Sequence, residues 1–398
     1  MKSKWFWLIY LVFAFIVGFV FSYLVYLGYW YRFVDGIKSL SWYDYPLWFF
    51  LTFYITLIIH ELSHLLAFVF QGVSIRALYL HMLIIYRSKT KWKIKFNMKH
   101  WFLLGGFVVP NLNEIDDDVS YQKTVKKFST SIIVAPIVTI SFMGLMILTW
   151  VLSILFDAQT SWVGFITLFS AYTTIFSLFY IRSFKLSNNS FYGDFVAYRK
   201  MKEDTLFQLV QLLQYIQFSL KTSALTRSYL FEQSKSFLKE HDMKTTLFYQ
   251  ILVMNYIEMV CYHEKEDDAI IQEKINRMHK NQLFRSDHGL TLLYDIALYQ
   301  YHLGFVEKSY QLMEDIKTKA SPKIDELLRT YLHKQFEHLL NIENHEAFLA
   351  NEDNHVLSIA SLFDVLMEDE EPRKPLPFKI WEIPVVFKEE TEEKSDSE

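Results

Sequence analysis

The sequence has few of the residues that stabilise small secreted domains or interrupt helices. It contains one cysteine, Cys261, with 11 glycines and 8 prolines among 398 residues. A single cysteine excludes an internal disulfide framework and any zinc site made of several cysteines. The formal net charge of −4 gives no general case for nucleic-acid binding, and we expect no nucleic-acid partner.

Charged residues are rare over long stretches of the first half of the chain. Four apolar stretches have the roughly 20 residues that a helix needs to cross a bilayer. They cover about residues 5–31, 46–70, 129–156 and 158–181. The first follows the basic start MKSK, but it is too long for a signal peptide and no small-residue cleavage site follows it. We therefore predict an integral membrane protein with about four transmembrane helices.

Lysine and arginine are concentrated on one side of these predicted helices. The loop after the second helix and the segment after the fourth are basic, whereas the connection between the third and fourth contains neither residue. Cytoplasmic loops of membrane proteins carry such an excess of positive charge. We therefore expect both termini, the basic loop and the second half of the chain to be cytoplasmic, in a bacterial plasma membrane.

The basic loop has a strand-like pattern. Its segment Ser74–Phe96 is rich in β-branched and aromatic residues around the turn-like RSKTK, and KWKIKF alternates charged with apolar side chains. We predict a β-hairpin at the membrane surface. Gly105 and Gly106 follow in LLGGFVVPN. They form either a simple turn or a strand edge to which an extended peptide could add through backbone hydrogen bonds.

The second half has the periodicity of a water-soluble helical protein. Beyond Tyr198, apolar residues recur at helical spacing for about 150 residues. The segment Ala297–Ile316 predicts a helix, a turn at Gly304 and a second helix, similar to one tetratricopeptide-type hairpin, although no clean repeat is visible. The predicted fold is thus an all-α membrane protein with a small β-hairpin, followed by an all-helical, tetratricopeptide-like cytoplasmic domain.

We divide the chain accordingly into a transmembrane domain (1–200), a cytoplasmic helical domain (203–365) and a proline-rich, acidic tail (366–398), which we expect to be disordered. Repeat-like helical domains usually offer a concave face to a peptide. We therefore expect the helical domain to have a cytoplasmic protein partner.

The second apolar stretch contains the sequence LIIHELSHLLAF. His60 and His64 are four residues apart, so a helix places both on one face, as two imidazole ligands of one zinc require. Glu61 then lies beside the metal as a general base. The alternative is a charged helix face, but an acidic side chain costs roughly 2.5–3.5 kcal/mol at the centre of a membrane helix. No lysine or arginine lies on this helix to neutralise Glu61.

A catalytic zinc needs a third protein ligand. Asp194, in FKLSNNSFYGDFVAYRK, is the only carboxylate between Asp157 and Glu203, and it follows the last predicted span. It is our candidate for this ligand. The alternative interpretation is an aspartate that caps a helix or lies on the surface.

These motifs occur in an order that resembles the site-2 protease family of intramembrane zinc metalloproteases. The LGGF stretch is similar to the GGY segment of that family, and Ala135 and Pro136 in VAPIVTI are similar to its small-residue–proline motif. Asp194 falls where the family places its third zinc ligand. The resemblance covers roughly residues 45–200. It implies one zinc per chain, held by His60, His64 and Asp194, and a membrane-embedded protein or peptide as substrate.

The sequence departs from this family in two places. Gly193 precedes Asp194 and Phe195 follows it, where the family usually has an Asp-Gly pair after an asparagine and a proline. Asn188 and Asn189 are the nearest asparagines, and the resemblance makes them candidate substrate contacts beside Gly105 and Gly106. No PDZ-like insert is present, unlike in many bacterial members.

Other classes of protein remain open at this point. A membrane protease related to CAAX processing would need a later membrane glutamate, which is hard to find here. A catalytically silent relative could act as a binding or docking module, but such a module has no use for Glu61 as a base. A zinc transporter would require a second intramembrane metal site, and nothing resembling one appears.

Overall fold

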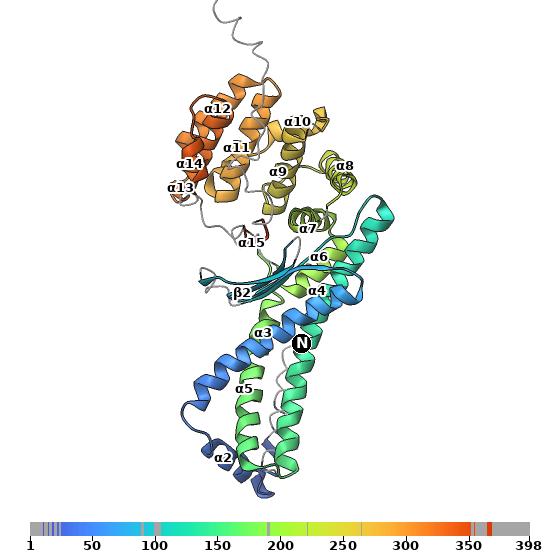
Figure 1. Cartoon of the computed structure of the whole chain (residues 1–398), viewed down its shortest axis with the longest axis vertical. Helices are drawn as coiled ribbons and strands as arrows, with labels where there is room; N and C mark the ends of the chain where they lie inside the picture. The colour runs from blue at the N-terminus through green and yellow to red at the C-terminus, as the bar shows by residue number, and fades with distance from the viewer. Residues whose placement is uncertain are drawn as a thin grey trace, which may run out of the picture.

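The computed structural model describes residues 11, 15, 18–19, 22–23, 25–88, 91–98, 105–188, 192–220, 222–263, 265–351, 354 and 364–367. The molecule is elongated, with long helices at one end, a small sheet in the middle and a layer of shorter helices at the other end (Figure 1). The described part is mostly helical, as predicted. About half of the predicted span at 5–31, and nearly all of the tail at 366–398, lie outside the described residues.

Among the described residues, three helices are long and apolar enough to cross a membrane: α3 (Asp44–Phe70), α4 (Asp118–Leu155) and α5 (Thr160–Ser183). They correspond to the second, third and fourth predicted spans and support an integral membrane protein. A short helix, α2 (Tyr29–Lys38), contacts α5. The helix α4 begins well before residue 129 because Asp117 and Ser120 form a capping box at its start, which satisfies backbone amides of its first turn.

The predicted hairpin is part of a four-stranded antiparallel sheet. Its strands are β1 (Ile75–Leu80), β2 (Leu83–Arg87), β3 (Trp92–Phe96) and β4 (Gly106–Pro110), in the order β3-β2-β1-β4. β2 and β3 form the hairpin expected around RSKTK. The stretch before that turn holds two strands rather than one, because the chain reverses at His81, whose φ of 55° lies in the left-handed region. β4 forms an edge of the sheet.

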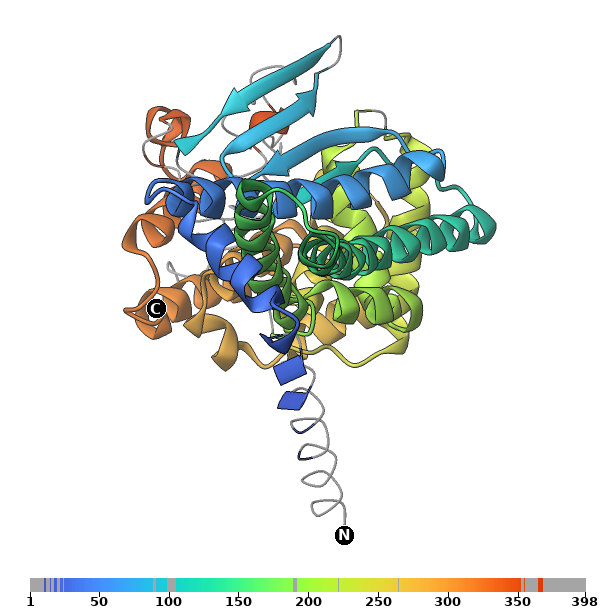
Figure 2. The same ribbon diagram turned by 90° about the horizontal axis from the view of Figure 1, so that it is seen from below.

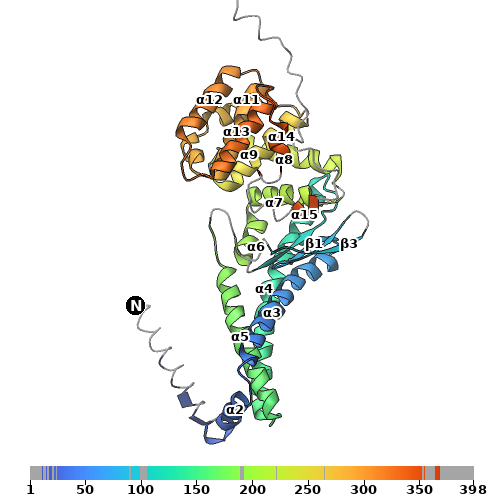
Figure 3. The ribbon, with the colours of Figure 1, turned by 60° about the vertical axis from the view of Figure 1, so that its left-hand side comes forward.

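The sheet lies between the long helices and the helical layer (Figure 3). Successive side chains of a strand point to opposite faces. Accordingly, Leu78 and Leu80 join the core that includes Leu57 and Phe68 of α3, whereas Ala77 and Tyr79 pack in a separate apolar cluster on the other side. That second cluster includes Val365 and Leu366 of the short helix α15 (Asp364–Met367).

The remaining helices follow α5 in the chain. They are α6 (Asp194–Glu203), α7 (Thr205–Phe218), α8 (Ala224–Glu240), α9 (Leu247–Tyr262), α10 (Ala269–Arg277), the 3-10 helix η2 (Lys280–Arg285), α11 (Asp287–His302), α12 (Val306–Lys319), α13 (Glu326–Leu339) and α14 (Glu346–Ala350). The helix–turn–helix predicted around Gly304 is confirmed as α11 and α12, with a φ of 82° at this glycine. Viewed from the end that carries α2, the long helices lie in front of this layer and the strands extend to one side (Figure 2).

Candidate metal centre

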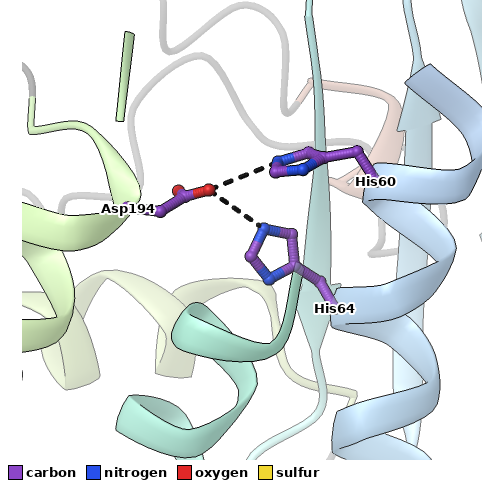
Figure 4. A group of neighbouring side chains, drawn as sticks. All are labelled: His60, His64 and Asp194. Atoms are coloured by element: carbon purple, nitrogen blue, oxygen red, sulfur yellow. Dashed lines mark ion pairs between the residues drawn. The ribbon is translucent and has the colours of Figure 1, made fainter. Parts of the chain in front are cut away.

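Two helices that are distant in the sequence bring three candidate ligands together. His60 and His64 lie one turn apart on α3, and Asp194 is the first residue of α6. The Oδ2 atom of Asp194 lies 3.3 Å from Nε2 of His60 and 3.6 Å from Nε2 of His64 (Figure 4). One ligand atom from each of the three residues lies within 4.8 Å of the others, so the group could hold one metal ion.

The other nitrogen of each imidazole is held by α4. Nδ1 of His64 lies 2.8 Å from the carbonyl oxygen of Ser131, and Nδ1 of His60 lies 2.9 Å from Oγ1 of Thr139. A carbonyl oxygen can only accept, so Nδ1 of His64 carries the proton. In the neutral imidazole the lone pair is then on Nε2, which faces Asp194. This is the form that a metal-binding histidine needs, with its second nitrogen fixed by an outer contact.

The Ala135-Pro136 motif lies between these two contacts on α4. Pro136 has no backbone N–H, so it cannot donate to the carbonyl of Ile132 four residues earlier, as an interior helix residue normally does. Ser131, whose carbonyl accepts from His64, precedes Ile132 directly. The buried Ala135 leaves space for the close approach of α3. The motif therefore shapes the part of α4 that supports the histidines.

Asp194 is positioned by the junction between α5 and α6. The amide of Gly193 donates to the carbonyl of Leu186, and the amide of Phe195 donates to that of Phe184. A Cβ atom at Gly193 would collide with the backbone of Ser183 and Phe184, so this junction requires glycine. The candidate contact Asn188 is exposed beside the junction, and Asn189 lies outside the described residues.

Glu61 is almost completely buried, with 4% of its surface exposed. The backbone of Gly106, at the start of β4, hydrogen-bonds to its carboxylate. A Cβ atom at Gly106 would lie 2.7 Å from Cγ of Glu61 and would also collide with the carbonyl oxygen of Tyr79. At Gly105 the same atom would meet open space. Of the two predicted glycines, only Gly106 is therefore required by close packing, and it brings the edge strand against the candidate base.

Aromatic rings cover His60, one of the candidate ligands. The rings of Tyr180 and Phe184 stack on His60, at centroid distances of 5.4 and 5.2 Å and interplanar angles of 9° and 13°. Both aromatic residues are buried. They belong to the end of α5, which leads directly into the junction before Asp194. The packing thus fixes the imidazole plane and limits access of bulk water to the site.

The donor set fits a divalent metal ion. Two imidazole nitrogens and one carboxylate oxygen are common zinc ligands. Oδ2 of Asp194 and Oε2 of Glu61 are both buried without a hydrogen-bond partner among the described residues. Burial alone would raise the pKa of the Asp194 carboxyl, but hydrogen bonds from His60 and His64, when their Nε2 atoms carry protons, hold this pKa well below its usual range. A cation between these groups would compensate the buried carboxylates.

A second group of side chains in the described residues has metal-ligand atoms within reach of one another. Glu337, Glu343 and His345 lie at the end of α13 and in the loop after it. Nε2 of His345 already contacts Oε2 of Glu337 at 2.9 Å, and the Glu343 side chain is 68% exposed. His345 and Glu337 thus form a largely buried ion pair, and the third member of the group lies in solvent, unlike a ligand of a built metal site.

Comparison with known proteins identifies the class. Residues 48–328 match the model of Peptidase family M50, which covers most of the chain. The chain therefore belongs to this family, the site-2 protease family of metallopeptidases, whose members use zinc. No curated protein matches the chain, and no solved structure matches it.

The family match confirms the resemblance drawn from the sequence and extends it. The match continues beyond residue 200 into the helical layer. The supporting contacts of the site were not anticipated. Ser131, Thr139, Tyr180 and Phe184 reach the histidines only through the packing of α3 against α4 and α5. In this part of α4, the Ala135-Pro136 motif is the one feature that the sequence comparison singles out.

Proposed function

We propose that this protein is an intramembrane zinc metalloprotease that hydrolyses peptide bonds in or near the transmembrane segments of membrane proteins or peptides. The observation that supports it most is the convergence of His60, His64 and Asp194 beside the buried carboxylate of Glu61. These residues come from α3 and from the start of α6, separated by two apolar helices. Family membership supports the same conclusion.

The residues divide the chemistry between them. His60, His64 and Asp194 would hold one zinc ion, which when bound activates a water molecule and polarises the carbonyl of the scissile bond. Glu61 accepts the proton of the attacking water and returns it to the leaving amine. Gly106 holds the carboxylate of Glu61 through its backbone, and Thr139 and Ser131 hold the imidazoles in orientation.

The edge strand β4 suits the presentation of an extended substrate. In the described part of the chain, β4 pairs with β1 and is the last strand on its side of the sheet. A transmembrane helix must unwind before attack, because its carbonyls are otherwise bonded internally. We infer that the unwound segment adds to β4 at Gly105 and Gly106, next to Glu61. Asn188 and Asn189 are proposed as further substrate contacts.

The arrangement of the chain favours a cytoplasmic position for the site. The basic sheet and the helical layer lie on the same side of α3, α4 and α5 (Figure 1). Positive charge marks this as the cytoplasmic side. The proposal includes a first span at residues 5–31, cytoplasmic termini and a plasma-membrane location. It also includes a tetratricopeptide-like helical domain at 203–365 that recruits a cytoplasmic partner.

Zinc content and cleavage together test this function. We expect about one zinc per purified wild-type chain, a sharp loss in Asp194→Ala, and no loss in Glu203→Ala, which removes an exposed carboxylate from the same helix. Glu337, Glu343 and His345 could also bind zinc, so the zinc content of His345→Ala is measured as well. Any zinc lost in that variant belongs to this second group. Equal zinc in wild type and Asp194→Ala would remove Asp194 from the site.

Glu61→Gln separates a protease from a silent binding module. This variant keeps all three candidate ligands, so it should retain zinc while losing the proton acceptor. A synthetic transmembrane peptide with a central Gly-Pro pair serves as substrate, and mass spectrometry detects its products. Wild type should cleave the peptide and Glu61→Gln should not. Zinc binding with identical product yields from both proteins would exclude Glu61 as the base.

A further inference from the structure

A second site lies in the helical layer, away from the metal centre. The helices α9, α11 and α13 enclose a cavity of about 370 Å³. This volume lies in the range of roughly 300–1,000 Å³ that is usual for ligand pockets. Its lining is largely apolar and includes Met254, Ile257, Leu298, Leu332 and Phe336. The charged residues of its lining are the acidic Glu258 and Asp295.

Asp295 of α11 and Glu258 of α9 both line this cavity. Asp295 is only partly exposed and has no hydrogen-bond or ion-pair partner within the described ranges of the chain. Burial, together with the neighbouring charge of Glu258, raises the pKa of Asp295 to about 7. No lysine or arginine side chain is part of the described lining. A carboxylate in such surroundings costs free energy unless a cation compensates it.

Two acidic residues between α9 and α10 are compensated. Asp267 accepts hydrogen bonds of 2.7 Å from the hydroxyls of both Tyr256 and Tyr299. Asp268 forms an ion pair of 2.9 Å with Lys239. Both of these partly buried carboxylates have partners within the chain. The contrast with Asp295 indicates that the partner of this carboxylate comes from outside the chain.

A smaller apolar cavity adjoins the first. It is lined by Cys261, Leu339 and Leu340 among others, and it shares Tyr262 and Leu298 with the acidic cavity. Its volume is only about 20 Å³, so it is an apolar hollow beside the acidic pocket rather than a second pocket. This combination is complementary to a positively charged side chain that has an apolar neighbour.

We propose that the pocket between α9, α11 and α13 binds a lysine or arginine side chain of an extended peptide, with the carboxylates of Asp295 and Glu258 as its counter-charges. The aliphatic stem of such a side chain packs against Leu332 and Phe336, while its charged end reaches the carboxylates. An apolar neighbour in the peptide contacts Tyr262 and Leu298. Peptide binding at this pocket does not depend on the peptidase site. The tests of the two proposals can therefore give opposite results.

Calorimetric titration of the full chain in detergent tests this proposal. The probe is acetyl-Leu-Lys-Phe-amide, and acetyl-Leu-norleucine-Phe-amide is the matched peptide without the amine. We expect the lysine peptide to bind at least about tenfold more tightly, since hydrogen bonds to charged groups are the stronger kind. Equal binding of both peptides, or no binding up to millimolar concentration, would overturn the proposal.

Variants locate the binding. Asp295→Asn should remove the preference for lysine, whereas Asp287→Asn, an exposed aspartate of the same helix, should leave it intact. Gln335→Trp should weaken both peptides by filling the cavity from a partly exposed position of α13. This second variant keeps the test decisive if Asp295→Asn does not fold. Wild-type binding in Gln335→Trp would exclude this pocket.

Discussion

Nδ1 of His60 lies 2.9 Å from Oγ1 of Thr139, a contact between buried side chains 79 positions apart in the chain. Thr139 is 1% exposed, so no water replaces its hydroxyl if it is removed. His60 is otherwise held by two stacked aromatic rings, which fix its plane but not which of its nitrogens faces Asp194. The threonine is therefore the group that keeps Nε2 of His60 directed at Asp194.

Replacing this hydroxyl should weaken metal binding without removing a ligand. Thr139→Val has nearly the same shape but cannot hydrogen-bond to Nδ1. Loss of such an outer contact typically reduces metal affinity by about 10–100-fold. Competition for zinc against a chelator of known affinity measures the change. Thr139→Ser keeps the hydroxyl and should bind zinc much as wild type does; a valine variant with wild-type affinity would contradict this role.

The two adjacent glycines before β4 should respond differently to alanine. At Gly106 the added methyl group meets Glu61 and the backbone of Tyr79, so Gly106→Ala forces the strand away from the candidate base. Overpacking of this kind costs about 1–3 kcal/mol. At Gly105 the methyl group enters open space. We expect Gly106→Ala to lower both unfolding stability in detergent and peptide cleavage, and Gly105→Ala to change neither measurably.

Both substitutions lower the conformational entropy of the unfolded chain by the same amount. Gly105→Ala therefore serves as the control for this effect. A loss of cleavage in both variants would indicate that the whole glycine pair, rather than the contact with Glu61, is needed.

The sequence revealed those parts of the site that depend on local spacing. His60 and His64 share a helix face by their separation alone, and Asp194 is identified because few carboxylates occur near the predicted spans. Thr139 and Gly106 carry no comparable signal, since their contacts arise from the packing of α4 and β4 against α3. The same limit applies to the sheet. The hairpin around RSKTK was visible, but the pairing of β4 with β1 joins segments that are separated by β2 and β3.

A buried arginine links the sheet to the helical layer. Arg76 of β1 is 2% exposed, and its guanidinium donates to the carbonyl oxygens of Phe218 at 3.1 Å and Leu366 at 2.5 Å. Arg76→Met keeps much of the aliphatic volume but leaves the buried carbonyl of Leu366 and the half-buried carbonyl of Phe218 without this donor, at a cost of about 1–3 kcal/mol. Denaturant unfolding in detergent should show this loss. Arg87→Met, at the exposed end of β2, should leave stability within about 0.5 kcal/mol of wild type.

Binding of the lysine peptide should depend on pH through Asp295. Burial and the charge of Glu258 raise the pKa of Asp295 to about 7, so its carboxyl is neutral in mildly acidic solution and charged above neutrality. The lysine of the peptide stays protonated throughout, since its ordinary pKa is about 10.4. Affinity should therefore increase as the pH rises from about 6 to 8. Calorimetry at several pH values measures this change.

The other titratable groups of the described lining are Glu258, Tyr262 and His263 on and after α9, and Tyr294 on α11. His263 is the histidine among these groups, so His263→Gln is the necessary control. If Asp295 is responsible, the pH dependence persists in His263→Gln and disappears in Asp295→Asn. The opposite result, a dependence that vanishes with His263 and survives without Asp295, would assign the recognition of the cation to a different group in the pocket.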